Sequence, residues 1–186
     1  EIGCSIGVLT RMLAERCDAL VGLDLAEHAL AEARARCGSL SHVRFERAQV
    51  PKQWPEGSFD LILLSAVWQH VAPGDRARAF RKLATLLKPG GLLVITLRHG
   101  PAPPDRPMHE VSAGEVEALA REHGLSVTRT ERAPETSRRP GVTWTTMCLT
   151  LPDDGAGALP LLRGIILNDD KSATYKLGLL RAITKV

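Results

Sequence analysis

The feature that most constrains the fold is a regular alternation of short apolar runs with stretches of helical periodicity. Residues 59–65, Phe-Asp-Leu-Ile-Leu-Leu-Ser, are almost continuously apolar, as expected for a central parallel strand that is covered on both faces. In the neighbouring stretches, apolar residues recur three and four positions apart, which predicts amphipathic helices. The alternation therefore predicts an α/β fold with a doubly wound, mostly parallel sheet.

The same periodicity gives the expected bounds of the elements. Helices are expected over residues 6–17 and 26–37, around Phe80–Leu87, and from Ser112, whose spacing to Glu115 is that of a capping box. In the first helix the expected buried face consists of Leu9, Met12, Leu13 and Cys17. Strands are expected over residues 19–24, 43–50, 59–65 and 92–97, with a closing antiparallel pair over 125–132 and 142–151. Lys88-Pro89-Gly90-Gly91 should end a helix, and residues 100–107 should form a loop.

Length and composition predict one main globular domain. The chain has 186 residues, of which 44% are apolar and 24% charged, so it is not of a disordered or fibrous class. The domain is expected over residues 1–151, followed by a linker over 152–158 and the helical start of an incomplete second unit over 159–186. The sheet should have seven strands with a truncated first strand, because Glu1 already lies in the loop that would follow it.

Charge and cysteine usage exclude several kinds of partner. The net charge of +3 comes from interspersed residues, so no basic stripe indicates a nucleic acid. The four cysteines form no C-x-x-C pair, which argues against a metal site or a disulfide framework and favours a cytoplasmic protein. No apolar run reaches the roughly 20 residues that span a bilayer, so no membrane partner is expected.

The first seven residues carry the clearest binding motif. Glu1-x-Gly3-x-Ser5-x-Gly7 lies between an expected strand end and a helix start, where small residues let a ligand approach the main chain. Asp24 follows Gly3 by 21 residues, at the end of the next strand, where a carboxylate can accept hydrogen bonds from ribose hydroxyls. This pair predicts a cofactor that contains adenosine. The chain has neither the G-x-G-x-x-G of dinucleotide enzymes nor the Gly-Lys-Ser/Thr of a P-loop.

Four ordered stretches, residues 1–7, 20–25, 59–70 and 86–100, together resemble the class I S-adenosylmethionine-dependent methyltransferases. The resemblance covers roughly residues 1–151 and implies S-adenosyl-L-methionine as cofactor. It implies cofactor contacts at Glu1, Gly3, Cys4, Ser5, Gly7, Asp24, Leu25, Gln49 and Ser65. Most members have glycine at the position of Ser5, and the Cys-Ser-Ile-Gly version resembles the nodulation N-methyltransferase subgroup. Many have an acidic residue at the position of Gln49, whose side-chain carbonyl offers an uncharged acceptor for the adenine amino group.

The resemblance further implies methyl transfer to a small-molecule or metabolite acceptor, at oxygen or nitrogen. The cofactor carries the activated group, so neither a protein nucleophile nor a metal is needed. His70 is the candidate general base, and Trp68, Arg98 and His99 are candidates for the acceptor pocket. The structural alternatives are a packing histidine at His70, a core residue at Trp68, solvated loop charges at Arg98 and His99, and a helix cap at Asp24.

The sequence argues against one alternative function and leaves another open. A base-modifying DNA methyltransferase should carry an Asn/Asp-Pro-Pro-aromatic motif or a Pro-Cys nucleophile after a core strand, and residues 65–68 contain neither. A non-catalytic domain of the same fold could instead regulate or scaffold a fused C-terminal unit. Residues 165–180 resemble a segment of bacterial HNH-nuclease-type proteins, but no His-Asn-His cluster is present to assign nuclease activity.

Overall fold

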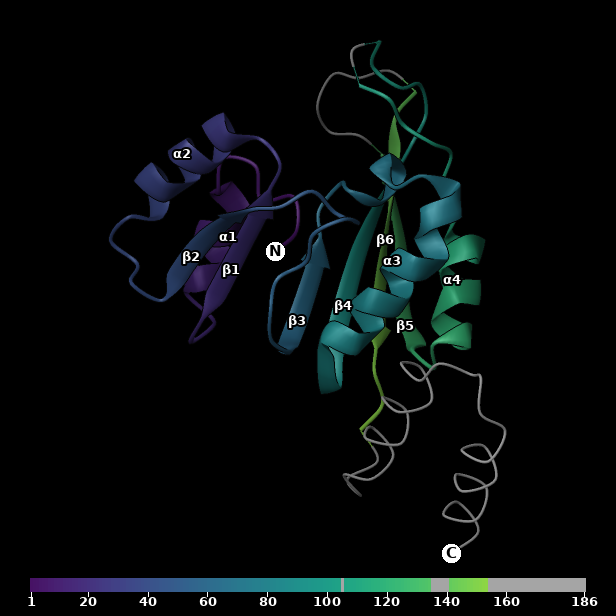
Figure 1. Ribbon diagram of the computed structural model, residues 1–186. Coiled ribbons are helices and arrows are strands. Elements are labelled where there is room, and N and C mark those ends of the chain that lie inside the picture. The colour runs from purple at the N-terminus through teal and green to yellow at the C-terminus, as the bar shows by residue number, and fades with distance from the viewer. Residues whose placement is uncertain (105, 135–140, 154–186) are drawn as a thin grey trace, which may run out of the picture.

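The computed structural model describes residues 1–104, 106–134 and 141–153, and Figure 1 shows how their elements are arranged. The helical elements are α1 (Val8–Ala14), α2 (Glu27–Cys37), η1 (Trp68–His70), α3 (Pro73–Leu86) and α4 (Ala113–Glu122). The strands are β1 (Leu20–Asp24), β2 (Val43–Arg47), β3 (Phe59–Leu64), β4 (Leu87–His99), β5 (Ser126–Pro134) and β6 (Thr143–Thr150). The predicted alternation of helices and strands is confirmed. The predicted linker and second unit lie outside the described residues, apart from the first residues of the linker.

The strands form two ladders. In the first, β1 pairs with β2 in parallel, and in the second the order is β3-β4-β6-β5. β3 and β4 are parallel, whereas β6 runs antiparallel to both β4 and β5. The predicted closing antiparallel pair is therefore confirmed.

The backbone of residues 1–3 joins the two ladders, with Ile2 at the centre of the junction. Ile2 forms isolated parallel bridges with Leu23 of β1 and Leu64 of β3. Its amide donates to Leu63 O at 2.7 Å, and its carbonyl accepts from Ser65 N at 3.0 Å. The predicted seven-stranded sheet is not found in the described part of the chain, which has six strands. Residues 1 and 2 precede the turn at Gly3, so the pairing between β1 and β3 is limited to bridges.

The core lies between the second ladder and the helices in front of it. Figure 1 shows α3 and α4 in front of β4, β5 and β6. Phe80 and Leu83 of α3 and Val116 of α4 are fully buried against the sheet residues Leu93, Ile95, Leu97, Met147 and Leu149. Burying each such side chain contributes about 1.5–3 kcal/mol, so this layer anchors the carboxyl end of β4. Among the described helices, none is long and apolar enough to cross a membrane.

Helix α1 departs from its prediction in length and in orientation. It begins at Val8, after a left-handed Gly7, and ends at Ala14. The buried residues are Thr10 and Ala14, whereas Leu9 and Met12 of the predicted core face are exposed. The prediction was wrong here because α1 packs against α2 through small residues. A Cβ on Gly7 would lie 2.9 Å from Ala33 Cβ.

The Lys88–Gly91 turn lies inside β4 rather than after the helix. Helix α3 ends at Leu86 and the strand starts at the next residue. The pairing with β3 then jumps from Phe59↔Leu87 to Leu61↔Leu92, so residues 88–91 form an irregularity in the ladder. Gly90 has a φ of 75°, and its amide donates to Leu151 O at 2.8 Å. The turn thus ties the base of β4 to the segment after β6.

Arg76 connects three segments beneath the carboxyl edge of the sheet. Its side chain is buried in α3 and donates to Val71 O, to Glu110 O and to the Glu115 carboxylate at 3.1, 2.8 and 2.6 Å. Glu115 therefore does not complete the predicted capping box, although Ser112 Oγ does accept from Glu115 N at 3.1 Å. Arg76 thereby fixes the start of α4 and the loop before it.

Replacing Arg76 tests this role. The Arg76→Met variant leaves Glu115 and two carbonyls without their donor, and it should lose about 3 kcal/mol of unfolding free energy in guanidinium titrations. Arg78→Met is the matched control, because Arg78 lies on the same helix in an exposed pair with Asp75 and should cost less than about 1 kcal/mol. Equal losses in the two variants would contradict the assignment.

Candidate functional site

The predicted binding residues meet at one edge of the sheet. Because β1 and β3 are both paired in parallel with Ile2, their carboxyl ends, at Asp24 and Leu64, lie at the edge where residues 3–7 turn into α1. The backbone confirms the proximity, since Gly3 N donates to Leu23 O at 2.8 Å and Ser65 N donates to Ile2 O. In a parallel α/β sheet this is the edge at which ligands bind.

Gly3 is required by close packing of the main chain. Its φ is +80°, and a Cβ there would lie 2.7 Å from Ser65 O and 2.5 Å from Val67 Cγ2. A side chain would therefore push residues 65–67 away from the loop. Glycine at this position holds the turn after Ile2 against the turn after β3.

Asp24 joins the loop to the next helix. Its Oδ2 accepts from Ser5 N at 2.8 Å, and its Oδ1 accepts from Ala26 N at 2.9 Å. Asp24 is therefore not the helix cap of the structural alternative, because the N-cap of α2 is Ala26 and, at this helix, Asp24 accepts only from the amide of that residue. The two backbone hydrogen bonds leave room for a ligand, because each carboxylate oxygen has a second lone pair that can accept another hydrogen bond.

Ser5 occupies a conformation that favours glycine. Its φ is +49°, and its side chain is exposed. The left-handed region costs a residue with a Cβ about 1–2 kcal/mol, and the hydrogen bond from Ser5 N to Asp24 offsets part of that cost. This bond explains how serine is accommodated in the loop.

Glu1 gives the loop a partly buried acidic group, and the buried Cys4 lies near it. Glu1 Oε2 accepts from the Thr10 hydroxyl at 2.5 Å. Burial raises the pKa of the Glu1 carboxyl, and the nearby Asp24 carboxylate raises it further. Burial also raises the pKa of the Cys4 thiol to about 12, with Asp24 and Glu1 adding to the effect. Cys4 is therefore a neutral packing thiol, and the two carboxylates favour a cationic ligand beside them.

Leu25 and Gln49 lie at the same carboxyl edge of the sheet, just after the ends of β1 and β2. Leu25 is 52% exposed, a large apolar side chain directly after the strand end. The Gln49 side chain is also exposed, while its backbone amide donates to Gln53 Oε1 at 3.0 Å. Arg47 Nε donates to Leu25 O at 3.2 Å, which helps to hold the two strand ends together.

His70 lies in η1, after the end of β3. Its Nδ1 is 2.9 Å from Pro107 O. Because a carbonyl oxygen can only accept, the neutral ring must carry its proton on Nδ1, and its Nε2 lone pair is then free to accept a proton. The His70 ring is exposed.

Two candidates for the acceptor pocket are structural. Trp68 is fully buried and packs edge-on against Phe80, with ring centroids 6.1 Å apart. Arg98 is buried as well, and its guanidinium donates to Pro101 O at 2.9 Å and to Met108 Sδ at 3.6 Å. Together with His109 N, which donates to Gln69 O, these contacts hold the predicted loop after β4 in place.

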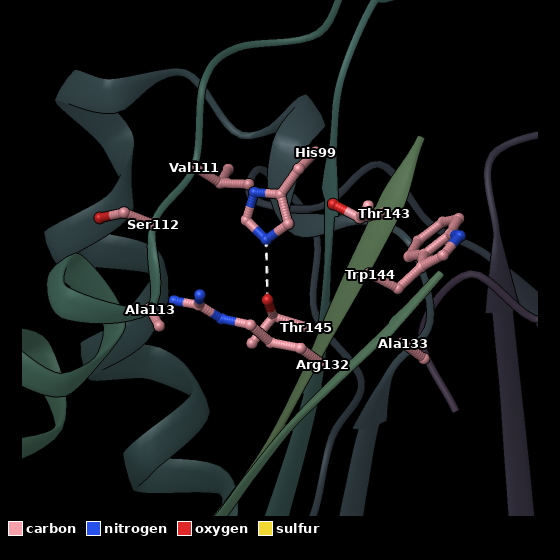
Figure 2. A pocket seen from close by; sticks show the side chains of 9 residues that line it. All are labelled: His99, Val111, Ser112, Ala113, Arg132, Ala133, Thr143, Trp144 and Thr145. Atoms are coloured by element: carbon pink, nitrogen blue, oxygen red, sulfur yellow. Dashed lines mark hydrogen bonds between the residues drawn. The ribbon is translucent and has the colours of Figure 1, made fainter. Parts of the chain in front are cut away.

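His99 lies in a hollow farther along the same edge. The hollow has a volume of about 580 Å³, and its lining residues are His99, Val111, Ser112, Ala113, Arg132, Ala133, Thr143, Trp144 and Thr145. Figure 2 shows His99 Nε2 directed at Thr145 Oγ1, 2.9 Å away. Most of these residues were not predicted, because the hollow depends on the register that places His99 opposite Thr143.

Comparison with known proteins identifies the family. The methyltransferase domain family matches residues 1–95, which is just over half of the chain. The chain belongs to the methyltransferase domain family. A separate domain of unknown function (DUF8808) matches residues 155–186, which lie outside the described part.

Individual methyltransferases agree with this assignment. Nodulation protein S of Bradyrhizobium diazoefficiens is 30% identical over 95 residues, covering 50% of this chain and 46% of that protein. Trans-aconitate 2-methyltransferase of Deinococcus radiodurans is 32% identical over 111 residues, covering 60% and 40% of the two chains. This methyltransferase chain therefore spans less than half the length of these curated relatives.

A solved structure shows the same fold. The N-methyltransferase NodS from Bradyrhizobium japonicum WM9, in complex with S-adenosyl-L-homocysteine, superimposes with a TM-score of 0.69 at 23% identity. The superposition covers 82% of this chain and 76% of that structure. This superposition confirms the predicted Rossmann-like methyltransferase fold.

The His70 tautomer can be tested in the methyltransferase domain. Nitrogen-15 spectra of the imidazole rings, recorded at about pH 8 where free imidazole is neutral, should show His70 protonated on Nδ1. His28, exposed on α2, is the comparison and should show a mixture of tautomers. A His70 ring protonated on Nε2 would contradict the contact with Pro107.

Proposed function

We propose that this chain binds S-adenosyl-L-methionine at the carboxyl edge of β1 and β3 and transfers its methyl group to a small-molecule acceptor. The observation that carries the proposal is the contact of the Glu1–Gly7 loop with Asp24, in a chain that belongs to the methyltransferase domain family. The S-adenosyl-L-homocysteine in the NodS structure supports the choice of cofactor.

The chemistry of the edge fits this cofactor. The methionine end carries an ammonium and the sulfonium is positive, so both suit the acidic side formed by Glu1 and Asp24. We assign the methionine end to the main chain of Gly3, Cys4, Ser5 and Gly7, with Ser65 facing it across the Gly3 turn. Gly3 keeps these two turns in contact, because no side-chain atom lies between them.

The adenosine end fits the neighbouring strand ends. Asp24 retains one lone pair on each oxygen for the two ribose hydroxyls. The exposed Leu25 offers an apolar face for the adenine ring, and Gln49 offers its side-chain carbonyl to the adenine amino group. These contacts complete the proposed cofactor site.

Catalysis would rest on positioning and proton removal. S-adenosyl-L-methionine supplies an activated methyl group, so the chain has to align the acceptor in line with the sulfonium and exclude water. His70 is the proposed base, because the Pro107 carbonyl fixes the proton on Nδ1 and leaves Nε2 to take a proton from an acceptor hydroxyl or ammonium. Arg98 and Trp68 would act through the loop and the core rather than by touching the acceptor.

The acceptor would be a small molecule that enters beside His99. The hollow of about 580 Å³ matches the size of a small-molecule site. The matched relatives carry names of both N- and O-methyltransferases, among them the ubiquinone biosynthesis O-methyltransferase of Acinetobacter baylyi, so the acceptor atom can be oxygen or nitrogen.

Calorimetry with S-adenosyl-L-homocysteine tests the cofactor site. The chain should form a 1:1 complex that Asp24→Asn weakens by about 10- to 100-fold, because the amide offers one acceptor oxygen in place of two. Asp60→Asn is the control, since Asp60 lies near the opposite end of β3 in an exposed pair with Lys88 and should leave affinity unchanged. Thermal unfolding of each variant checks the fold. A folded chain that gives no binding heat would refute the proposal.

A further inference from the structure

We propose that the hollow beside His99 binds the carboxylate of an anionic acceptor, and that Arg132 is the residue that selects it. The inference deepens the proposed function and rests on it for the role of the bound molecule. The binding site itself depends on β4, β5, β6 and the start of α4 alone.

Arg132 is a cation without a counter-ion in the described residues. It lies on β5 and lines the hollow, and in Figure 2 its side chain extends toward the start of α4. On the same strand, Arg129 instead forms an ion pair with Glu131. The acidic side chain on the first turn of α4, Glu115, is already bound to Arg76 at 2.6 Å. The positive charge of Arg132 is therefore not neutralised by these neighbouring carboxylates.

The other walls favour an anion with an apolar body. Val111, Ala113, Ala133 and Trp144 contribute apolar surface to the hollow. Thr145 is almost fully buried, and its hydroxyl fixes the His99 ring at the end of β4. The first turn of α4 adds the positive end of its dipole on the side that Arg132 faces. A guanidinium binds a carboxylate through two parallel hydrogen bonds, which gives Arg132 the means to orient such a ligand.

The position of the hollow fits an acceptor site. His99 ends β4, whose neighbour β3 ends beside the proposed cofactor loop, so both sites open at the same edge. Thr96, three residues before His99, accepts through Oγ1 from Ala66 N at 2.7 Å and so links the two strand ends. An acceptor held by its carboxylate at Arg132 can direct its remaining atoms along this edge toward the cofactor.

Binding measurements with matched probes test the inference. The full chain, saturated with S-adenosyl-L-homocysteine, is titrated with acetate, succinate and phenylacetate and with the neutral amide of each. At least one carboxylate should bind about 10-fold or more tightly than its amide, and Arg132→Gln should remove that difference. Arg129→Gln, on the same strand but outside the hollow, should preserve it.

The outcomes separate this inference from the proposed function. Equal binding of every carboxylate and its amide, the absence of binding by all six probes, or equal effects of the two arginine variants would overturn the inference. Carboxylate binding that requires Arg132 and persists in the Asp24→Asn variant would support it, even while that variant binds S-adenosyl-L-homocysteine more weakly. Failure of the wild-type chain to bind S-adenosyl-L-homocysteine would refute the proposed function and, with it, the role of the hollow as an acceptor site.

Discussion

The pairing of Ile2 with two strands is the interaction on which the rest of the structure depends. Ile2 bridges Leu23 and Leu64. Its own amide and carbonyl bond to the β3 side, at Leu63 O and Ser65 N, while the neighbouring Glu1 carbonyl and Gly3 amide bond to Leu23 of β1. Buried backbone groups must be paired, and here those at the carboxyl ends of β1 and β3 find partners in residues 1–3. Without these hydrogen bonds the loop that follows would not reach either strand end.

That junction also determines the chemistry of the site. The turn at Gly3 carries Ser5 N to Asp24 and places Glu1 beside the same carboxylate. Two acidic groups then share a partly buried edge, where burial raises the pKa of the Glu1 carboxyl and the Asp24 charge adds to the effect. Farther along the edge the charge becomes positive, because Arg132 is a cation and the first turn of α4 carries the positive end of the helix dipole. The cationic methyl donor would therefore bind at the acidic end of this edge, and an anionic acceptor would bind at its positive end.

Sequence reasoning was accurate where a local pattern determines the structure. Short apolar runs predicted the strands at β1 and β3, and the spacing of Gly3 and Asp24 predicted their meeting at one edge. It failed where a partner far along the chain decides the outcome. The buried face of α1 was wrong because α2 packs through Ala33, and the Glu115 side chain turns to Arg76 rather than to its own helix start.

Most residues of the hollow could not be predicted from the sequence for the same reason, because partners far apart in the chain form it. His99 could be proposed from its position at a strand end, but Arg132 and Thr145 join it through the antiparallel register of β4, β5 and β6. That register follows from long-range pairing, and a one-residue slip of one strand would turn the side chain on that strand away from the other two. Trp68 and Arg98 were placed near the acceptor by sequence, whereas the structure buries Trp68 in the core against Phe80 and Arg98 beneath the loop that it holds.

The central claim is that the cofactor binds where the first loop meets Asp24. Hydrogen exchange of the full chain, with and without S-adenosyl-L-homocysteine, tests it most directly. Binding at this junction should slow exchange in residues 1–8, 24–26 and 65–70 and leave β5 unchanged, because β5 lies outside the proposed cofactor site. Protection centred on β5 and β6, with none in residues 1–8, would contradict it.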